Sequence, residues 1–154
     1  MKALSWGEFE QADPELARFG LSRLDGKVAY LATVRADGLP RAHPVTPVIG
    51  EGHCFLFVEP SSPKARDLLE KGFYCLHCSM NDSSGSSGEF QVTGIAEEVG
   101  ETEMRNLAES VSSFRPASRY VLFELKMSEV LSTSYHGSTP RRQKWAAIVD
   151  HSLS

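Results

Sequence analysis

Residues 27–58, KVAYLATVRADGLPRAHPVTPVIGEGHCFLFV, contain the pattern that decides the fold. The nearly continuous apolar run at 27–35 predicts a buried strand, and the Asp37-Gly38 pair after it is typical of a tight hairpin turn. A second strand is predicted over 41–49 and a third over 53–58, with a Gly-Glu-Gly turn between them. Strands joined by turns this short must pair antiparallel.

Two prolines interrupt the second of these strands. Pro44 and Pro47 cannot donate a backbone hydrogen bond, so the strand is predicted to lie at a sheet edge or to be locally irregular. One interpretation is an edge strand that its prolines protect from aggregation. The other is that unpaired backbone groups around Val45 and Thr46 bind a planar heterocycle.

The rest of the chain repeats this pattern of short strands and adds a few helices. Asp13 and Ser62 each precede a proline and are predicted to cap helices, and Gly94 predicts a bend as at a barrel corner. In the helix after Ser62, Ala65, Leu68 and Leu69 have the spacing of a buried face. We expect helices over 13–23, from Ser62 and over 101–114, strands over 72–79, 89–99 and about 119–127, and a polar loop over 81–88. Six short antiparallel strands predict a mainly β fold, a small barrel in a single domain over 1–154.

Composition narrows the class of protein. The chain has 154 residues, is 41% hydrophobic and carries a net charge of −4, which predicts one globular domain without a nucleic-acid partner. It has no apolar run of membrane-spanning length and no signal-like start, so we expect a cytoplasmic protein that does not contact membranes. Three cysteines fit a reducing compartment. Cys75 and Cys78 form a CxxC motif, but in a strand they point to opposite faces, so we expect no metal site.

Cations at two places are candidates for anion binding. Lys64 and Arg66 occupy the first turn of the helix after Ser62, where the helix dipole disfavours cations and favours a bound anion. They are equally consistent with two solvated surface cations. Arg41 and His43 project from one face of their strand and could meet the same phosphate as Lys64, although a lone strand histidine is more often a surface residue. Near the C-terminus, cations and a stacking ring are consistent with a nucleic-acid tail, a phosphate-binding segment or a solvated end: Arg141, Arg142, Lys144 and Trp145. The net charge argues against the first of these.

The order of these motifs resembles a known family. The chain resembles the pyridoxamine 5'-phosphate oxidase-like, FMN-binding split-barrel family over about residues 25–130, through Leu31-Ala32-Thr33-Val34, Asp37-Gly38-Leu39-Pro40, His43-Pro44-Val45, Phe55-Leu56-Phe57, Ser61-Ser62-Pro63-Lys64 and Gly94-Ile95-Ala96-Glu97. The resemblance implies a six-stranded antiparallel split β-barrel. It also implies a homodimer with two flavin sites at the subunit interface.

The resemblance also implies a set of cofactor-binding residues. Lys64 matches the basic residue that holds the FMN phosphate, with Ser61 and Ser62 nearby, and His43 stands where larger oxidases have a phosphate-binding arginine. The other matches are residues implied to lie against the flavin: Pro44, Val45, Thr46, Pro47, Leu56, Phe57, Glu89, Gln91, Arg142 and Trp145. Of these, Glu89 replaces a flavin-contacting glutamine, for which Gln91 on the same face is an alternative.

The implied function is that of an FMN-binding oxidoreductase acting on a small molecule. No side chain in the sequence is an obvious acid or base, so no catalytic residue is predicted. Two alternatives stay open, a non-catalytic flavin-binding or stress-response module and a deazaflavin (F420)-dependent reductase. Classical pyridoxamine phosphate oxidase activity is the enzymatic function that we least expect, because that enzyme is longer.

Overall fold

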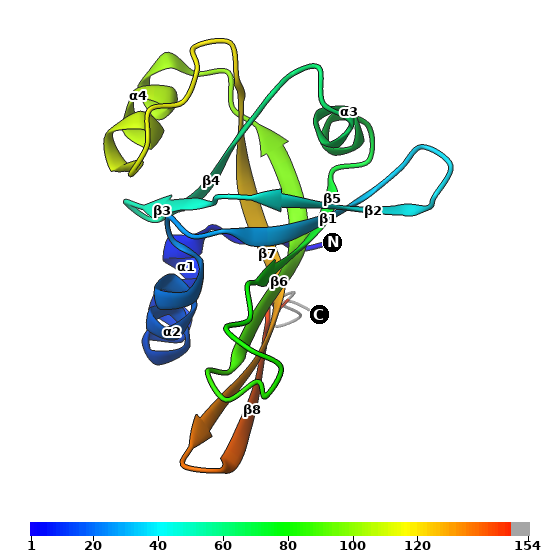
Figure 1. Ribbon diagram of the computed structural model, residues 1–154. Helices are drawn as coiled ribbons and strands as arrows, with labels where there is room; N and C mark the ends of the chain where they lie inside the picture. Colours follow the sequence, from blue (N-terminus) through cyan, green and yellow to red (C-terminus); the bar gives the residue numbers. More distant parts are fainter. Residues whose placement is uncertain (149–154) are drawn as a thin grey trace, which may run out of the picture.

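The computed structural model of the chain describes residues 1–148, so 149–154 of the predicted domain lie outside the described residues. The described part contains four helices and eight strands (Figure 1). The elements in chain order are α1 (Trp6–Ala12), α2 (Pro14–Leu24), β1 (Ala29–Val34), β2 (Pro40–Val45), β3 (Val48–Gly50), β4 (His53–Val58), α3 (Pro63–Glu70), β5 (Phe73–Cys78), β6 (Glu89–Glu98), α4 (Thr102–Val111), β7 (Val121–His136) and β8 (Thr139–Ala146).

All strand pairs are antiparallel and form one sheet, in the order β2-β1-β5-β6-β7-β4-β3, with β8 added beside β7. The predicted strand 41–49 is divided. Its first part, β2, pairs with β1, and its last part, β3, pairs with β4 at the other end of the sheet. Thr46 and Pro47 join the two edges and belong to neither strand, so the edge position and irregularity that the prolines predicted are confirmed.

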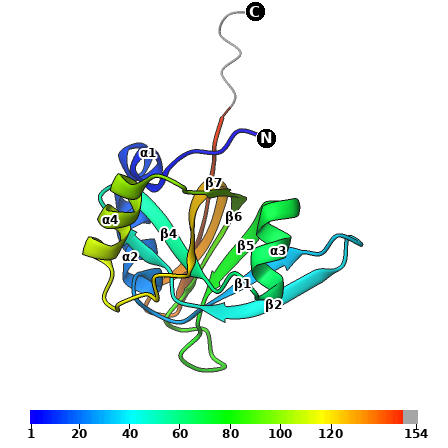
Figure 2. The same ribbon diagram turned by 90° about the horizontal axis from the view of Figure 1, so that it is seen from above.

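The sheet curls around one hydrophobic core that receives buried side chains from β1 to β7, and the partly buried Trp145 of β8 packs against it. Helices α1 and α2 lie together at one end of this barrel and α3 lies at the other (Figures 1 and 2). A second, smaller core lies between α4 and the outer face of β4 and β7, and it contains Phe55, Phe57 and Leu122. Among the described residues, none of the helices is long and apolar enough to cross a membrane.

The predicted caps are confirmed. The Asp13 side chain accepts a hydrogen bond from the Leu16 amide at the start of α2, and Ser62 does the same for Ala65 in α3. The prediction of a buried Leu69 is wrong, because its side chain is 53% exposed and Asp67 is buried in its place. Helix α1 was not predicted, although Ser5 and Glu8 form a reciprocal capping box at its start.

The C-terminal part of the sheet is larger than predicted. The expected strand 119–127 continues to His136 and turns back as β8. Together with the division of 41–49 into β2 and β3, this makes eight strands rather than six. The basic tail is therefore a paired strand, and Trp145 anchors it by packing its ring 4.8 Å from that of Phe9. The bend predicted at Gly94 is confirmed as a bulge in the pairing of β6 with β7.

Candidate functional site

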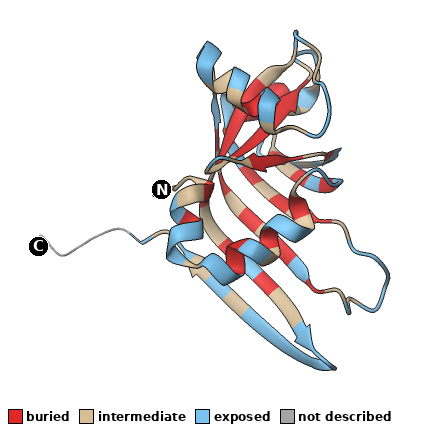
Figure 3. Ribbon diagram, turned by 90° about the vertical axis from the view of Figure 1, so that its left-hand side faces the viewer, coloured by how far each residue is buried: buried red, intermediate tan, exposed pale blue. Residues whose placement is uncertain are grey.

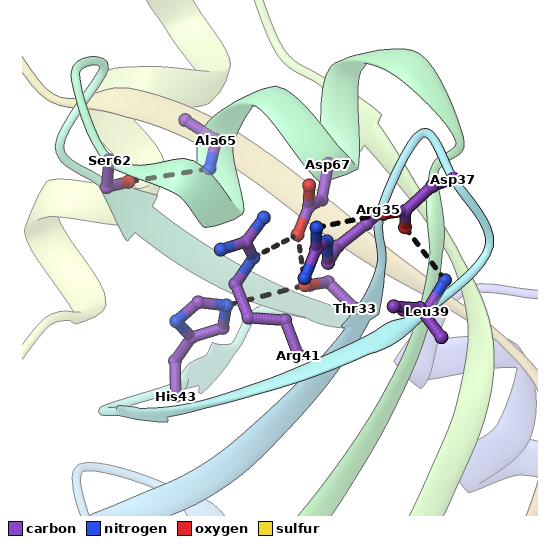
Figure 4. Close-up of polar contacts among 9 residues, drawn as sticks. All are labelled: Thr33, Arg35, Asp37, Leu39, Arg41, His43, Ser62, Ala65 and Asp67. Atoms are coloured by element: carbon purple, nitrogen blue, oxygen red, sulfur yellow. Dashed lines mark hydrogen bonds and ion pairs between the residues drawn. The ribbon is translucent and has the colours of Figure 1, made fainter.

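The candidate phosphate site lies where β2 passes α3, and Figure 4 shows Arg41 and His43 of β2 beside Asp67 of α3. Arg41 and His43 alternate with outward residues along β2, so both project toward the barrel side of the strand. Lys64 lies in the first turn of α3 and is close enough to influence the titration of the His43 ring. The sequence predicted that Arg41 and His43 share one face of their strand, and β2 has this alternation.

Asp67, one turn further along α3, holds the cluster together. Its side chain is 3% exposed, and one oxygen, Oδ2, accepts hydrogen bonds from the Thr33 hydroxyl at 2.7 Å and from Arg41 Nε at 2.9 Å. Burial alone would raise the pKa of this carboxyl, but the hydrogen bonds from Thr33 and Arg41 outweigh it and lower the pKa. Asp67 is therefore a buried carboxylate with a fixed cationic partner.

The same network orients His43. Its Nε2 lies 3.4 Å from Thr33 Oγ1. Because the Thr33 hydroxyl donates to Asp67, it can only accept from the ring, which places the proton on Nε2 and leaves Nδ1 as the free nitrogen. Burial first, and then the charges of Lys64 and Arg41, lower the pKa of His43. The ring is therefore neutral at pH 7, and an added anion would favour its protonation.

The start of α3 offers few backbone donors of its own. Pro63 has no amide hydrogen, and the Ala65 amide is bonded to Ser62. The Ser62 hydroxyl donates to the Glu59 carbonyl at 2.6 Å, and that of Ser61 donates to the Glu59 carboxylate. The two predicted serines are thus engaged with their own loop, and any anion bound here would rely mainly on the side chains of Arg41, His43 and Lys64.

The split in the barrel lies beside this cluster. Within the described residues, β3 pairs with β4 only as far as Phe55, so the segment from Leu56 to Val58 has a strand partner on one side only. The side chains of Leu56 and Phe57 are 1% and 9% exposed and belong to the two cores. Any contact between these two predicted residues and a cofactor would therefore come from the open backbone edge of β4.

A second group of predicted residues lies on the outer face of the sheet. Gln91 shares a row with exposed Tyr30 and Leu131, and Glu89 shares the next row with Thr133 and Arg142. Figure 3 shows the alternation of buried and exposed residues that separates the two faces. Trp145 is three residues from Arg142 and points to the opposite, core-facing side of β8, so only Arg142 of this pair joins the outer group.

In one chain, the two groups of predicted residues lie on opposite faces of the sheet. His43 pairs with the buried Leu31, whereas the neighbouring Pro44 pairs with the exposed Tyr30 in the row of Gln91. A planar ligand at β2 and α3 could not touch Gln91 or Arg142 of the same chain. The structure therefore brings together half of the predicted site and separates it from the other half.

Two residues of the cluster, Asp67 and Thr33, were not predicted from the sequence. Asp67 has the residue type of a surface countercharge, and its burial depends on the position of α3 against β1. Thr33 offers a weak signal, because it is a hydroxyl residue in an otherwise apolar strand. The CxxC prediction is confirmed in its geometry, since Cys75 and Cys78 alternate between the two faces of β5.

Comparison with known proteins identifies the fold of the chain. No family model matches the sequence, and no curated protein matches it. The fold is that of the pyridoxamine 5'-phosphate oxidase-like split barrels, as the sequence resemblance implied.

Three solved structures illustrate the likeness. The heme-binding protein from Mycobacterium smegmatis aligns with a TM-score of 0.69 at 19% identity, over 95% of this chain and 60% of that chain. The chain thus spans about three fifths of that neighbour's length. PhzG from Burkholderia lata 383, in complex with tetrahydrophenazine-1-carboxylic acid, aligns with a TM-score of 0.57 at 14% identity, over 91% of this chain and 92% of that chain. An F420 reductase aligns with a TM-score of 0.55 at 16% identity, over 71% of this chain and 94% of that chain.

Proposed function

We propose that the chain is an FMN-binding flavoprotein that works as a homodimer and transfers electrons or hydride to a small molecule. The observation that carries this proposal is the position of the predicted flavin residues. Those suited to a phosphate converge at β2 and α3, and those suited to a ring lie on the outer face of the same sheet. The fold, which is shared with an F420 reductase, is compatible with this use.

The chemistry of the first group fits a phosphate monoester. Arg41 and Lys64 supply permanent cations, and the free Nδ1 of His43 can accept a proton when a dianion binds. Hydrogen bonds between such cations and a phosphate are about twice as strong as neutral ones. The flavin ring would extend along the split, against the segment from Pro44 to Pro47 and the open edge of β4.

The second group supports a dimer. The outer face exposes several apolar side chains, among them Val28, Tyr30, Phe73 and Leu131, and an apolar face of this kind favours a protein partner. A second copy that places its outer face against the β2 end of the first would bring Glu89, Gln91 and Arg142 to the flavin. Each site would then combine residues of both chains.

The protein's part in catalysis would be binding and orientation. FMN, when bound, supplies the redox chemistry of its ring. Arg41, His43 and Lys64 would fix the phosphate end, and the rigid proline segment would line the ring without moving. Burial between two chains would exclude water from the ring. The residues described here assign no acid or base for the substrate.

The proposal is tested by purifying the protein and recording its visible spectrum, with and without added FMN. We expect flavin absorption bands and quenching of flavin fluorescence on binding, together with the mass of a dimer in sedimentation. A protein that neither copurifies with FMN nor quenches it would refute the proposal. A Soret band would instead favour heme binding, as in the heme-binding protein from Mycobacterium smegmatis.

Two further measurements separate the alternatives within flavin binding. Parallel titrations with FMN and with F420 decide between the two cofactors. Bound flavin that is photoreduced, but shows no turnover with NADH, NADPH or pyridoxamine phosphate, would favour the non-catalytic module.

A further inference from the structure

We infer that Asp67 is the positioning residue of the phosphate subsite and that it fixes Arg41 as a permanent phosphate ligand. This inference rests on the proposed function, since it assigns roles within the same site. The ligand class is a phosphate monoester, which is the part of FMN that riboflavin lacks.

The first observation is the way in which Asp67 holds Arg41. The carboxylate accepts from Arg41 Nε, the inner nitrogen of the guanidinium, at 2.9 Å. Among the described residues, neither terminal nitrogen of Arg41 has a hydrogen-bond partner. Figure 4 shows the guanidinium between Asp67 and the first turn of α3. Because one edge is anchored, the terminal nitrogens are held ready for a further anion, with little rotamer freedom left to lose on binding.

The second observation is the unusual environment of the carboxylate. A charge that is 3% exposed is costly to bury, and an apolar residue at such a position is often at least as stabilising as an ion pair. Helix α3 already buries Ala65 and Leu68 against the core, so the fold does not need a charge at position 67. A role in orienting Arg41 accounts for it.

The third observation concerns Arg41, which the family resemblance does not identify as a phosphate ligand. His43 stands where larger oxidases have an arginine, and its ring is neutral at pH 7, since burial, Lys64 and Arg41 lower its pKa. Arg41 lies two residues earlier on the same face of β2, so it can supply the missing permanent charge. The groups that face His43 are Arg41 on β2, Thr33 on β1, and Lys64 and Asp67 on α3.

The test compares the affinities of FMN and riboflavin, because only the phosphate subsite distinguishes them. Arg41→Gln and Asp67→Asn are each expected to weaken FMN binding about tenfold or more and to leave riboflavin binding unchanged. The double variant should bind FMN no more weakly than Arg41→Gln, because Asp67 acts through Arg41. Arg35→Gln is the matched control, since Arg35 lines the same small cavity but is paired with Asp37.

Each other outcome has a defined meaning. The inference is overturned if Arg41→Gln leaves FMN affinity unchanged, or if Asp67→Asn weakens FMN and riboflavin equally, as a purely structural role predicts. Should Asp67→Asn fail to fold, the more exposed Arg41→Gln still decides the role of the guanidinium. Equal wild-type affinity for FMN and riboflavin would overturn the phosphate subsite while flavin binding stands.

If the wild-type protein binds no flavin, the proposed function fails by itself. The subsite is then measured with inorganic phosphate, as a rise in unfolding temperature. A rise that Arg41→Gln and Asp67→Asn abolish would support the subsite, and no dependence on Arg41 would overturn it.

Discussion

Glu89 on β6 and Arg142 on β8 both pair with Thr133 of the intervening β7, and their side chains share the outer face of the sheet. They are 53 positions apart in the chain, and the long β7–β8 hairpin is what brings them together. On the same face lie Gln91, Tyr30 and Leu131, but not Arg41, His43 or Lys64. If all of these residues bind one flavin, they must come from two chains.

The first prediction tests this two-chain site. Tyr30→Glu places a carboxylate in the middle of the outer face, where the side chain is 52% exposed in one chain. Burying that charge in an apolar interface is costly, so we expect the dimer to dissociate and FMN binding to weaken with it. Sedimentation velocity and a flavin titration measure the two effects on the same sample.

Leu69→Glu is the control for this variant. Leu69 lies on α3, away from the outer face, and at 53% it is about as exposed as Tyr30. Its replacement should leave both the mass of the dimer and the affinity for FMN unchanged. A Tyr30→Glu protein that remains a dimer with normal FMN affinity would contradict the proposed interface.

The second prediction concerns Lys64. Its ammonium group is expected to bind the FMN phosphate, so Lys64→Ala should weaken FMN binding by about 1.5–3 kcal/mol, the range for hydrogen bonds to charged groups. Isothermal titration at moderate ionic strength gives the value. Lys71→Ala removes the same charge beyond the other end of α3 and should have little effect. Equal affinities of the wild-type protein and Lys64→Ala would remove Lys64 from the site.

Much of this fold could be predicted because local signals and tertiary contacts agree. The Asp37-Gly38 turn, the Ser62-Pro63 helix start and the bend at Gly94 each occur where the residue type demands them. The prolines at 44 and 47 predicted an edge or irregular strand, and β2 is an edge strand that ends before Pro47.

What could not be predicted depends on contacts distant in sequence. The strand β8 is polar and looks like a solvated tail, and only its pairing with β7 and the packing of Trp145 on Phe9 make it a strand. Asp67 has no signal of burial, because the Thr33 and Arg41 groups that satisfy it lie 34 and 26 positions away. The structure divides the candidate site residues between the two faces of the sheet, and the sequence alone does not predict this division.

The third prediction concerns the stability of the bulge. A Cβ atom on Gly94 would overlap the carbonyl oxygen of Lys126 on β7, which is backbone and cannot turn aside. Gly94→Ala should therefore destabilise the protein by about 2 kcal/mol or more, measured by urea unfolding. Gly100→Ala is the control, because its Cβ would meet open space. A Gly94→Ala protein as stable as Gly100→Ala would show that the β6–β7 pairing is looser than the bulge suggests.

The fourth prediction is a pH dependence of stability that comes from His77 on the outer face. Hydrogen bonding to Cys78, and then to the Glu89 carboxylate, raises the pKa of His77 to about 9 against the opposing effect of burial. The folded protein therefore holds this proton more tightly than the unfolded chain, whose histidine has a pKa of about 6.5. The stabilisation is complete below pH 6.5 and is lost as the pH rises through 9.

We expect the unfolding temperature of the wild-type protein to exceed that of His77→Gln at low pH, and the difference to shrink between about pH 6.5 and 9. Calorimetry across this pH range measures the difference in unfolding temperature, at a protein concentration where both proteins have the same oligomeric state. His136→Gln, on the exposed end of β7, serves as the control for replacing a histidine by glutamine. A difference that stays constant with pH would mean that the bonds of His77 to Cys78 and Glu89 do not hold its proton.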